Sequence, residues 1–167
     1  MSSIIAIDPG PVQSAIVHWH DGELGAFDIA PNAELEQVLT VATWPAESVL
    51  VIERVASFGM AVGEDVFETV YWTGRFAKTW DDRNYEAADR MTRHAVKMFW
   101  CKRGNAKDSN ITQAIVDRFG GVGGMKAAKG TKAKPGPLHG VTSHVWAALA
   151  LAIAYDETRA VEPVNTN

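Results

Sequence analysis

Two short apolar runs in this chain each end in a carboxylate, and this feature constrains the fold most. Residues 3–8 read Ser-Ile-Ile-Ala-Ile-Asp and stop at Pro9-Gly10, and residues 48–53 read Ser-Val-Leu-Val-Ile-Glu. Runs of this length and apolarity are typical of buried strands. A carboxylate at the end of a buried strand is costly unless it is exposed, paired or bound to a metal. We therefore expect Asp8 and Glu53 to lie at the same end of one sheet.

Further strands and helices are expected around these runs. Residues 14–18 and 23–29 have strand patterns joined by the turn His20-Asp21-Gly22, which gives an antiparallel meander with residues 3–8. A shorter fifth strand is expected at residues 85–89. Apolar residues at helical spacing predict helices over residues 33–43, 64–80, 92–100 and 107–119.

The sequence also predicts how these helices begin and pack. Asn32 is the expected N-cap of the first helix. A last helix, with Thr142 or Ser143 as its N-cap and its end near Tyr155, is apolar nearly all round and should pack against the sheet. Residues 120–140 lack periodicity and predict a mobile loop. The helix over 64–80 has an apolar side formed by Val66, Phe67, Val70, Tyr71, Gly74 and Ala77.

The length of 167 residues, 47% of them hydrophobic, suits one hydrophobic core and is too short for two independent domains. We expect one domain over residues 1–156 and a disordered tail over residues 157–167. The longest apolar run is shorter than the roughly 20 residues that cross a bilayer, and the sequence begins directly with a strand pattern rather than a signal peptide. A lone Cys101 suits a reducing compartment. These features predict a cytoplasmic protein.

Positive charge is concentrated in one segment, although the formal net charge is −4. Residues 97–134 hold nine basic residues against Asp108 and Asp117. A solvated basic surface and a phosphate-binding surface both fit this pattern, and phosphate binding is favoured by counterion release. The expected DNA-binding residues of this segment are Lys97, Lys102, Arg103, Lys107, Lys126, Lys129, Lys132 and Lys134.

A third side chain can join Asp8 and Glu53. Neighbouring strands lie roughly 4.7–4.9 Å apart, so the two carboxylates could repel each other, and a divalent cation between them would remove that repulsion. His144 stands in the first turn of the last helix, where packing would bring it to the strand ends. Each residue also has an ordinary interpretation: Asp8 as a turn initiator, Glu53 as the partner of Arg54 or a lysine, and His144 as a core histidine.

Five short motifs occur in one order along the chain. They are Ile4-Ile5-Ala6-Ile7-Asp8-Pro9-Gly10, Val51-Ile52-Glu53, Val96-Lys97, Gly104-Asn105-Ala106-Lys107 and His144-Val145-Trp146-Ala147-Ala148-Leu149-Ala150. Their order and spacing resemble the RuvC family of Holliday-junction resolvases. The resemblance implies an RNase H-like α/β fold, with a mixed five-stranded sheet flanked by helices. It also implies a homodimeric crossover junction endodeoxyribonuclease that uses two Mg²⁺ or Mn²⁺ ions per active site.

The resemblance assigns roles to individual residues. Asp8 and Glu53 match the first two acidic metal ligands of the family, and His144 falls where members carry Asp or His. Lys97 matches a basic residue close to the active site, so the expected catalytic residues are Asp8, Glu53, His144 and Lys97. Phe58 falls near an aromatic residue that stacks on a base at the junction. His144 could be a metal ligand, which would favour Mn²⁺ over Mg²⁺, or a general base.

One position departs from the family pattern, since Ala147 stands where members usually carry a second acid. A water could complete the metal shell, another acid such as Asp108 could swing in, or activity could be reduced or lost. We favour the water, because solvent and phosphate oxygens fill vacancies in shared two-metal sites.

Other functions and the mode of assembly also follow from the sequence. An RNase H-like nuclease for another nucleic acid and a junction-binding protein without cleavage are the alternatives, and Ala147 favours the second.

A two-fold symmetric junction is expected to be bound by a protein with two-fold symmetry. The small, compact chain suits a phage or prophage product acting in the bacterial cytoplasm or in an infected host. Either the homodimer interface or the core could use the aromatic residues Phe67, Tyr71, Trp72, Phe76 and Trp80.

Overall fold

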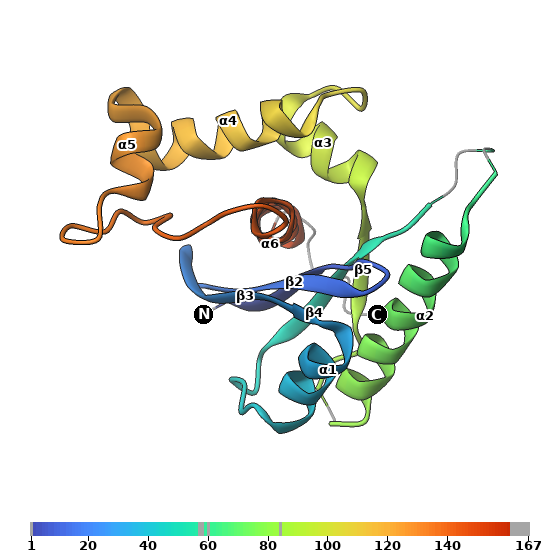
Figure 1. Cartoon of the computed structure of the whole chain (residues 1–167). Helices are drawn as coiled ribbons and strands as arrows, with labels where there is room; N and C mark the ends of the chain where they lie inside the picture. The colour runs from blue at the N-terminus through green and yellow to red at the C-terminus, as the bar shows by residue number, and fades with distance from the viewer. Residues whose placement is uncertain (1, 57–58, 60, 84, 161–167) are drawn as a thin grey trace.

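The computed structural model describes residues 2–56, 59, 61–83 and 85–160. Its centre is a five-stranded sheet with the strand order β3-β2-β1-β4-β5 (Figure 1). β1 pairs antiparallel with β2, and β2 with β3, whereas β4 is parallel to both β1 and β5. The predicted α/β class with a mixed five-stranded sheet is confirmed. The strands are β1 (Ser3–Asp8), β2 (Gln13–His20), β3 (Glu23–Pro31), β4 (Val49–Arg54) and β5 (Asp89–Thr92).

Helices cover both faces of the sheet (Figure 1). The two faces have separate cores because strand side chains alternate: Ile5 and Ile7 pack on the side of α1 and α2, and Ile4 and Ala6 on the side of α6. α3, α4 and α5 lie on the same side as α6. The helices are α1 (Asn32–Val41), α2 (Glu64–Asp81), α3 (Arg93–Cys101), α4 (Asp108–Gly120), α5 (Gly124–Lys129) and α6 (Val145–Arg159), with a 3₁₀ turn at Gly121–Gly123.

α6 is the buried helix that the sequence predicts. Every residue from Ala148 to Ala154 is fully buried, and its alternating alanines let the backbone lie close to β1 and β2. The helix begins later than expected, because Ser143 has a left-handed φ of 45° and His144 is the N-cap residue. In the part of the chain that the structure describes, no helix combines the length and apolarity that crossing a membrane requires.

The buried side of α2 is not the apolar side that the sequence pattern gives. Phe67, Val70 and Tyr71 are exposed. Phe76 and Trp80 pack against the sheet and set the orientation of the helix. Thr69 and Thr73 lie on the same side, and their hydroxyls donate to the carbonyls four residues earlier. The buried residues of α2 are Thr69, Thr73, Phe76 and Trp80.

Two boundaries predicted from the sequence are wrong. β5 begins at Asp89, whereas the expected strand ended there, because Tyr85 stacks on Trp80 at 4.4 Å and the Trp80 indole donates to the Glu86 carbonyl. These contacts hold residues 85–86 against α2, away from β4. The expected tail is also shortened, since α6 continues through Arg159, which pairs with Glu86.

Residues 120–140 are ordered by apolar contacts, not a mobile loop. α5 and the turn after it fold back on themselves, with the Leu138 amide donating to the Ala128 carbonyl at 2.8 Å. Ala128, Leu138 and Val141 are buried in the same core as α6. Single apolar residues spaced irregularly give no periodic signal, although these three are buried on folding.

Asn32 is the first residue of α1, not its N-cap, and it is buried. Its amide oxygen accepts a hydrogen bond from the Ser14 hydroxyl at 2.6 Å, and its amide nitrogen donates to the Gly10 carbonyl at 2.9 Å. Gly10 is required here, because a Cβ would stand 2.4 Å from the Gln13 carbonyl oxygen. Asn32 thus fixes the loop that follows Asp8.

We predict that Asn32→Ala lowers the free energy of unfolding by about 1–3 kcal/mol, because the buried Ser14 hydroxyl loses its hydrogen-bond acceptor and the Gly10 carbonyl loses its donor. Urea denaturation followed by circular dichroism measures this loss. Asn105→Ala is the matched control, since Asn105 is exposed in a turn and its loss should change stability by less than about 0.5 kcal/mol. Equal stability of the two variants would contradict the prediction.

Candidate active site

Asp8 and Glu53 lie side by side where two parallel strands end. Ile7 of β1 pairs with Ile52 of β4, so the two acids follow at the same level on adjacent strands. Their side chains are only 15% and 17% exposed. The structure therefore brings together the first two predicted site residues, at the same end of the sheet.

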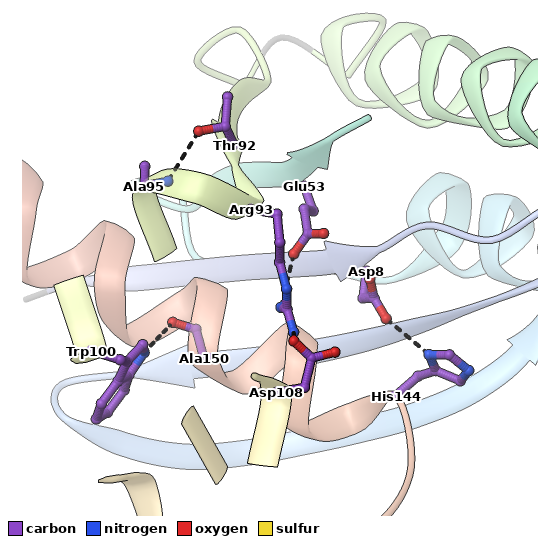
Figure 2. Close-up of polar contacts among 9 residues, drawn as sticks. All are labelled: Asp8, Glu53, Thr92, Arg93, Ala95, Trp100, Asp108, His144 and Ala150. Carbon is purple, nitrogen blue, oxygen red and sulfur yellow. Dashed lines mark hydrogen bonds and ion pairs between the residues drawn. The ribbon is translucent and has the colours of Figure 1, made fainter. Parts of the chain in front are cut away.

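His144 reaches the same place from α6. Its Nδ1 atom lies 3.2 Å from Oδ2 of Asp8 (Figure 2). The imidazole is 65% exposed, so it stands at the surface of the site and not in the core. Because Asp8 faces Nδ1, Nε2 is the ring nitrogen available to substrate or solvent.

Arg93 joins the site and was missed by sequence reasoning. Its guanidinium nitrogens contact Oε2 of Glu53 at 3.1 Å and Oδ1 of Asp108 at 2.7 Å, as Figure 2 shows. Arg93 follows β5 directly, and Thr92 caps α3 by accepting from the Ala95 amide. Placing the fifth strand at residues 85–89 hid this position, whereas a strand ending at Thr92 would have put Arg93 beside Glu53.

Burial and mutual repulsion make negative charge unfavourable in this site. Burial is the main cause that raises the pKa of Asp8, and the nearby His144 partly opposes it. Burial also raises the pKa of Glu53 to about 7, against the attraction of Arg93 and with a further increase from the Asp8 charge. Asp108 adds to the repulsion on both acids. The site therefore favours an added positive charge.

The donor atoms suit a divalent cation, but they do not yet enclose one. Carboxylate oxygens and an imidazole are ligands for Mg²⁺ and Mn²⁺. Among the residues that the structure describes, no three His, Cys, Asp or Glu side chains converge closely enough to hold an ion. Arg93 lies between Glu53 and Asp108, so a cation could bind them together only after this guanidinium moves.

Two surface cavities flank His144. One of about 440 Å³ is formed by the loop after β1, from Asp8 to Ala15, together with Ile29, Thr69 and His144. The other, of about 230 Å³, lies between α4 and the start of α6 and is lined by Arg93, Asp108, His144 and Ala147 among others. The imidazole can therefore be approached from either side.

The predicted basic residues lie on the α6 side of the sheet, but they do not enter the cluster of acids. Lys97 follows Arg93 by one helical turn on α3 and is half-buried, and no polar contact between described residues joins it to Asp8, Glu53 or His144. Lys129 lies over the ring of Trp146 in α6, at 5.9 Å from the ring centroid. Exposed positions are occupied by Lys102, Arg103, Lys107, Lys126, Lys132 and Lys134.

Two aromatic predictions have different outcomes. Phe58, the expected base-stacking residue, lies outside the described residues. Phe76 and Trp80 are fully buried, so they belong to the core and are not available to a partner subunit. Phe67 and Tyr71 stay on the surface of α2, with 65% and 54% exposure.

We predict that the metal-free protein loses stability, relative to Glu53→Gln, as pH rises from about 4.5 to about 7. The folded state binds a proton on Glu53 more tightly than the unfolded chain does, since the pKa rises from 4.5 to about 7, so stability falls across this range by up to about 1.4 kcal/mol per pH unit. Urea denaturation in EDTA at several pH values measures the slope. Glu34→Gln, a surface substitution of the same charge, is the control, and parallel slopes for wild type and Glu53→Gln would refute the prediction.

No protein-family model matches the sequence, and no curated protein matches it. Solved structures do match, among them two of RuvC. The structure of Thermus thermophilus RuvC is 15% identical, covers 97% of this chain and 99% of its own, and has a TM-score of 0.63. T. thermophilus RuvC in complex with Holliday junction substrate is 14% identical, with 95% of each chain covered and a TM-score of 0.64. At these identities the likeness establishes the architecture: the chain has the RNase H-like fold of RuvC, as its motifs predict.

Proposed function

We propose that this protein is a metal-dependent endonuclease that hydrolyses phosphodiesters in four-way DNA junctions and other branched DNA. The observation that carries the proposal is the approach of His144 to Asp8, next to Glu53, at the strand ends of a RuvC-like fold. Three residues remote in sequence supply the ligand types of a Mg²⁺ or Mn²⁺ site. A structural neighbour bound to a Holliday junction substrate supports DNA junctions as the substrate class.

The residues of the site divide the chemistry between them. Asp8, Glu53 and His144 would hold two Mg²⁺ or Mn²⁺ ions. When bound, such ions lower the pKa of an attacking water and stabilise the leaving 3′ oxygen. Asp8 orients the imidazole through Nδ1, which leaves Nε2 to bind a cation or accept a proton. Lys97 would offset negative charge that builds on the phosphate.

Binding is proposed to come from the basic segment and from a second copy of the chain. Lys129 and Trp146 connect α5 to the start of α6, so the basic residues of α5 and its turn lie on the approach to His144. A two-fold junction suits a homodimer, and the exposed residues Phe67, Val70 and Tyr71 of α2 are its proposed interface. This role in DNA recombination and repair would place the protein with DNA in the cytoplasm, in a bacterium or a phage-infected host.

A junction-binding protein without cleavage is the second candidate function. It is favoured by the pairing of Arg93 with Glu53, which leaves a predicted metal ligand occupied by an internal cation. The two candidates share a DNA-binding surface and differ only in the chemistry at Asp8.

We predict that the wild type nicks labelled four-way junctions in Mg²⁺ or Mn²⁺. Asp8→Asn should bind the junctions equally well but cut them about a hundredfold more slowly or worse, because the substitution removes a metal ligand and not a DNA-binding group. Gel assays with four-way, forked and linear duplexes measure both properties. Asp28→Asn removes the same charge from exposed β3 and is the control. If neither the wild type nor Asp8→Asn cuts DNA, the junction-binding protein without cleavage is favoured. If the wild type cuts linear duplex as well as junctions, the structure-specific enzyme is refuted.

We predict that Lys97→Ala lowers the rate of cleavage more than junction affinity, because Lys97 follows Arg93, the partner of Glu53, by one helical turn. Lys129→Ala and Lys132→Ala should instead weaken binding and reduce the slope of log K against log salt by about one unit for each phosphate that the protein no longer neutralises. Single-turnover cleavage and binding titrations in increasing salt separate the two effects. Lys78→Ala, on the opposite face of the sheet in α2, is the control, and the reverse pattern would overturn this division.

A further inference from the structure

The cavity between α4 and α6 contains an acid that the proposed metal site does not yet use. Asp108 is the first residue of α4, and its side chain is 72% exposed. It lines the same 230 Å³ cavity as His144 and Ala147, and Ala147 has only a methyl group. The first turn of α6 has no acidic residue that could enter this space. Asp108 is therefore the carboxylate that a ligand bound beside His144 would meet.

Arg93 marks the place of a positive charge between two acids. Its two terminal nitrogens divide between Glu53 and Asp108, so one guanidinium bridges side chains from β4 and α4 (Figure 2). Arg93 is 24% exposed and stands at the cavity wall. A guanidinium on a long, partly exposed side chain can move into solvent, whereas the strand ends that carry Asp8 and Glu53 are fixed by the sheet.

The number of donors also favours Asp108. Hard divalent cations take six or more ligands, mostly oxygens, and Asp8, Glu53 and His144 supply only three side chains. The charge of Asp108 acts on both Asp8 and Glu53, which places it within the same electrostatic cluster. Removing Arg93 from between Glu53 and Asp108 would leave an acidic cluster that a divalent ion neutralises better than a single positive charge does.

We propose that Asp108 is a further carboxylate ligand of the metal site, and that the Arg93 guanidinium holds Glu53 and Asp108 until a divalent cation displaces it. This inference rests on the proposed metal-dependent site and adds a ligand and a resident counter-ion to it. Arg93 is a positioning residue in this scheme, since it acts through the two carboxylates. Metal binding and release of Arg93 are then one exchange of cations.

Binding of Mn²⁺ to the purified protein, without DNA, tests this exchange. Calorimetry or the electron paramagnetic resonance of free Mn²⁺ gives the affinity. Asp108→Asn should bind Mn²⁺ about tenfold more weakly or worse, the range seen when groups around a metal are removed. Arg93→Gln should bind it about fivefold more tightly, since no partly exposed ion pair has to break. Asp117→Asn, an exposed acid on the same helix, should bind like the wild type.

The double variant decides between a ligand and a mere partner of Arg93. If Asp108 binds the metal, adding Asp108→Asn to Arg93→Gln again weakens Mn²⁺ binding about tenfold. Equal affinities of Arg93→Gln and the double variant overturn the inference, as does weaker binding by Arg93→Gln alone. Because Asp108 is exposed, Asp108→Asn is expected to fold and is informative by itself.

Failure of this inference is distinguishable from failure of the proposed nuclease. Unchanged Mn²⁺ affinity in Asp108→Asn, together with junction cleavage by the wild type, rejects the extra ligand and keeps the enzyme. The predicted order of Mn²⁺ affinities without junction cleavage keeps the ligand and rejects the enzyme.

Discussion

The rest of the structure depends on two carboxylates that adjacent parallel strands force together. β1 and β4 are buried, so Asp8 and Glu53 cannot separate without breaking the strand pairing between them. Their repulsion, in surroundings that exclude most water, has to be offset by positive groups from elsewhere in the chain. α6 contributes His144 and α3 contributes Arg93. The helices on this face are thus organised around a local excess of negative charge.

This arrangement connects the fold to the proposed chemistry. The sheet fixes the two acids, and the groups that neutralise them stand at helix ends, where side chains can move. Cavities on both sides of His144 leave room for a substrate, and the α5 segment brings positive charge to the same side of the sheet. Fixed acids surrounded by cationic side chains that can move suit the proposed site, which would exchange Arg93 for a metal ion and then bind the phosphate backbone of DNA.

The sequence predicts the parts of the fold that local patterns encode. The apolar runs that end at Asp8 and Glu53, and the apolar stretch after His144, are unambiguous, so the sheet centre, α6 and the meeting of these residues could be expected. The orientation of α2 could not, because the side chains of Phe76 and Trp80 compete with Phe67 and Tyr71 for the core and only tertiary packing decides. Arg93 was hidden because β5 has only four residues and begins where the expected strand ended.

The close packing of α6 makes the position of the imidazole a property of the whole helix. Ala150, Ala152 and Ala154 are fully buried, so each is surrounded by packed atoms. A larger side chain at any of them would tilt or lift the helix as a rigid rod and carry His144 away from Asp8, since tightly packed interiors transmit strain. Substitutions deep in the core should therefore be able to displace His144 in proteins that still fold. The position of His144 relative to Asp8 thus depends on buried alanines that lie outside the site.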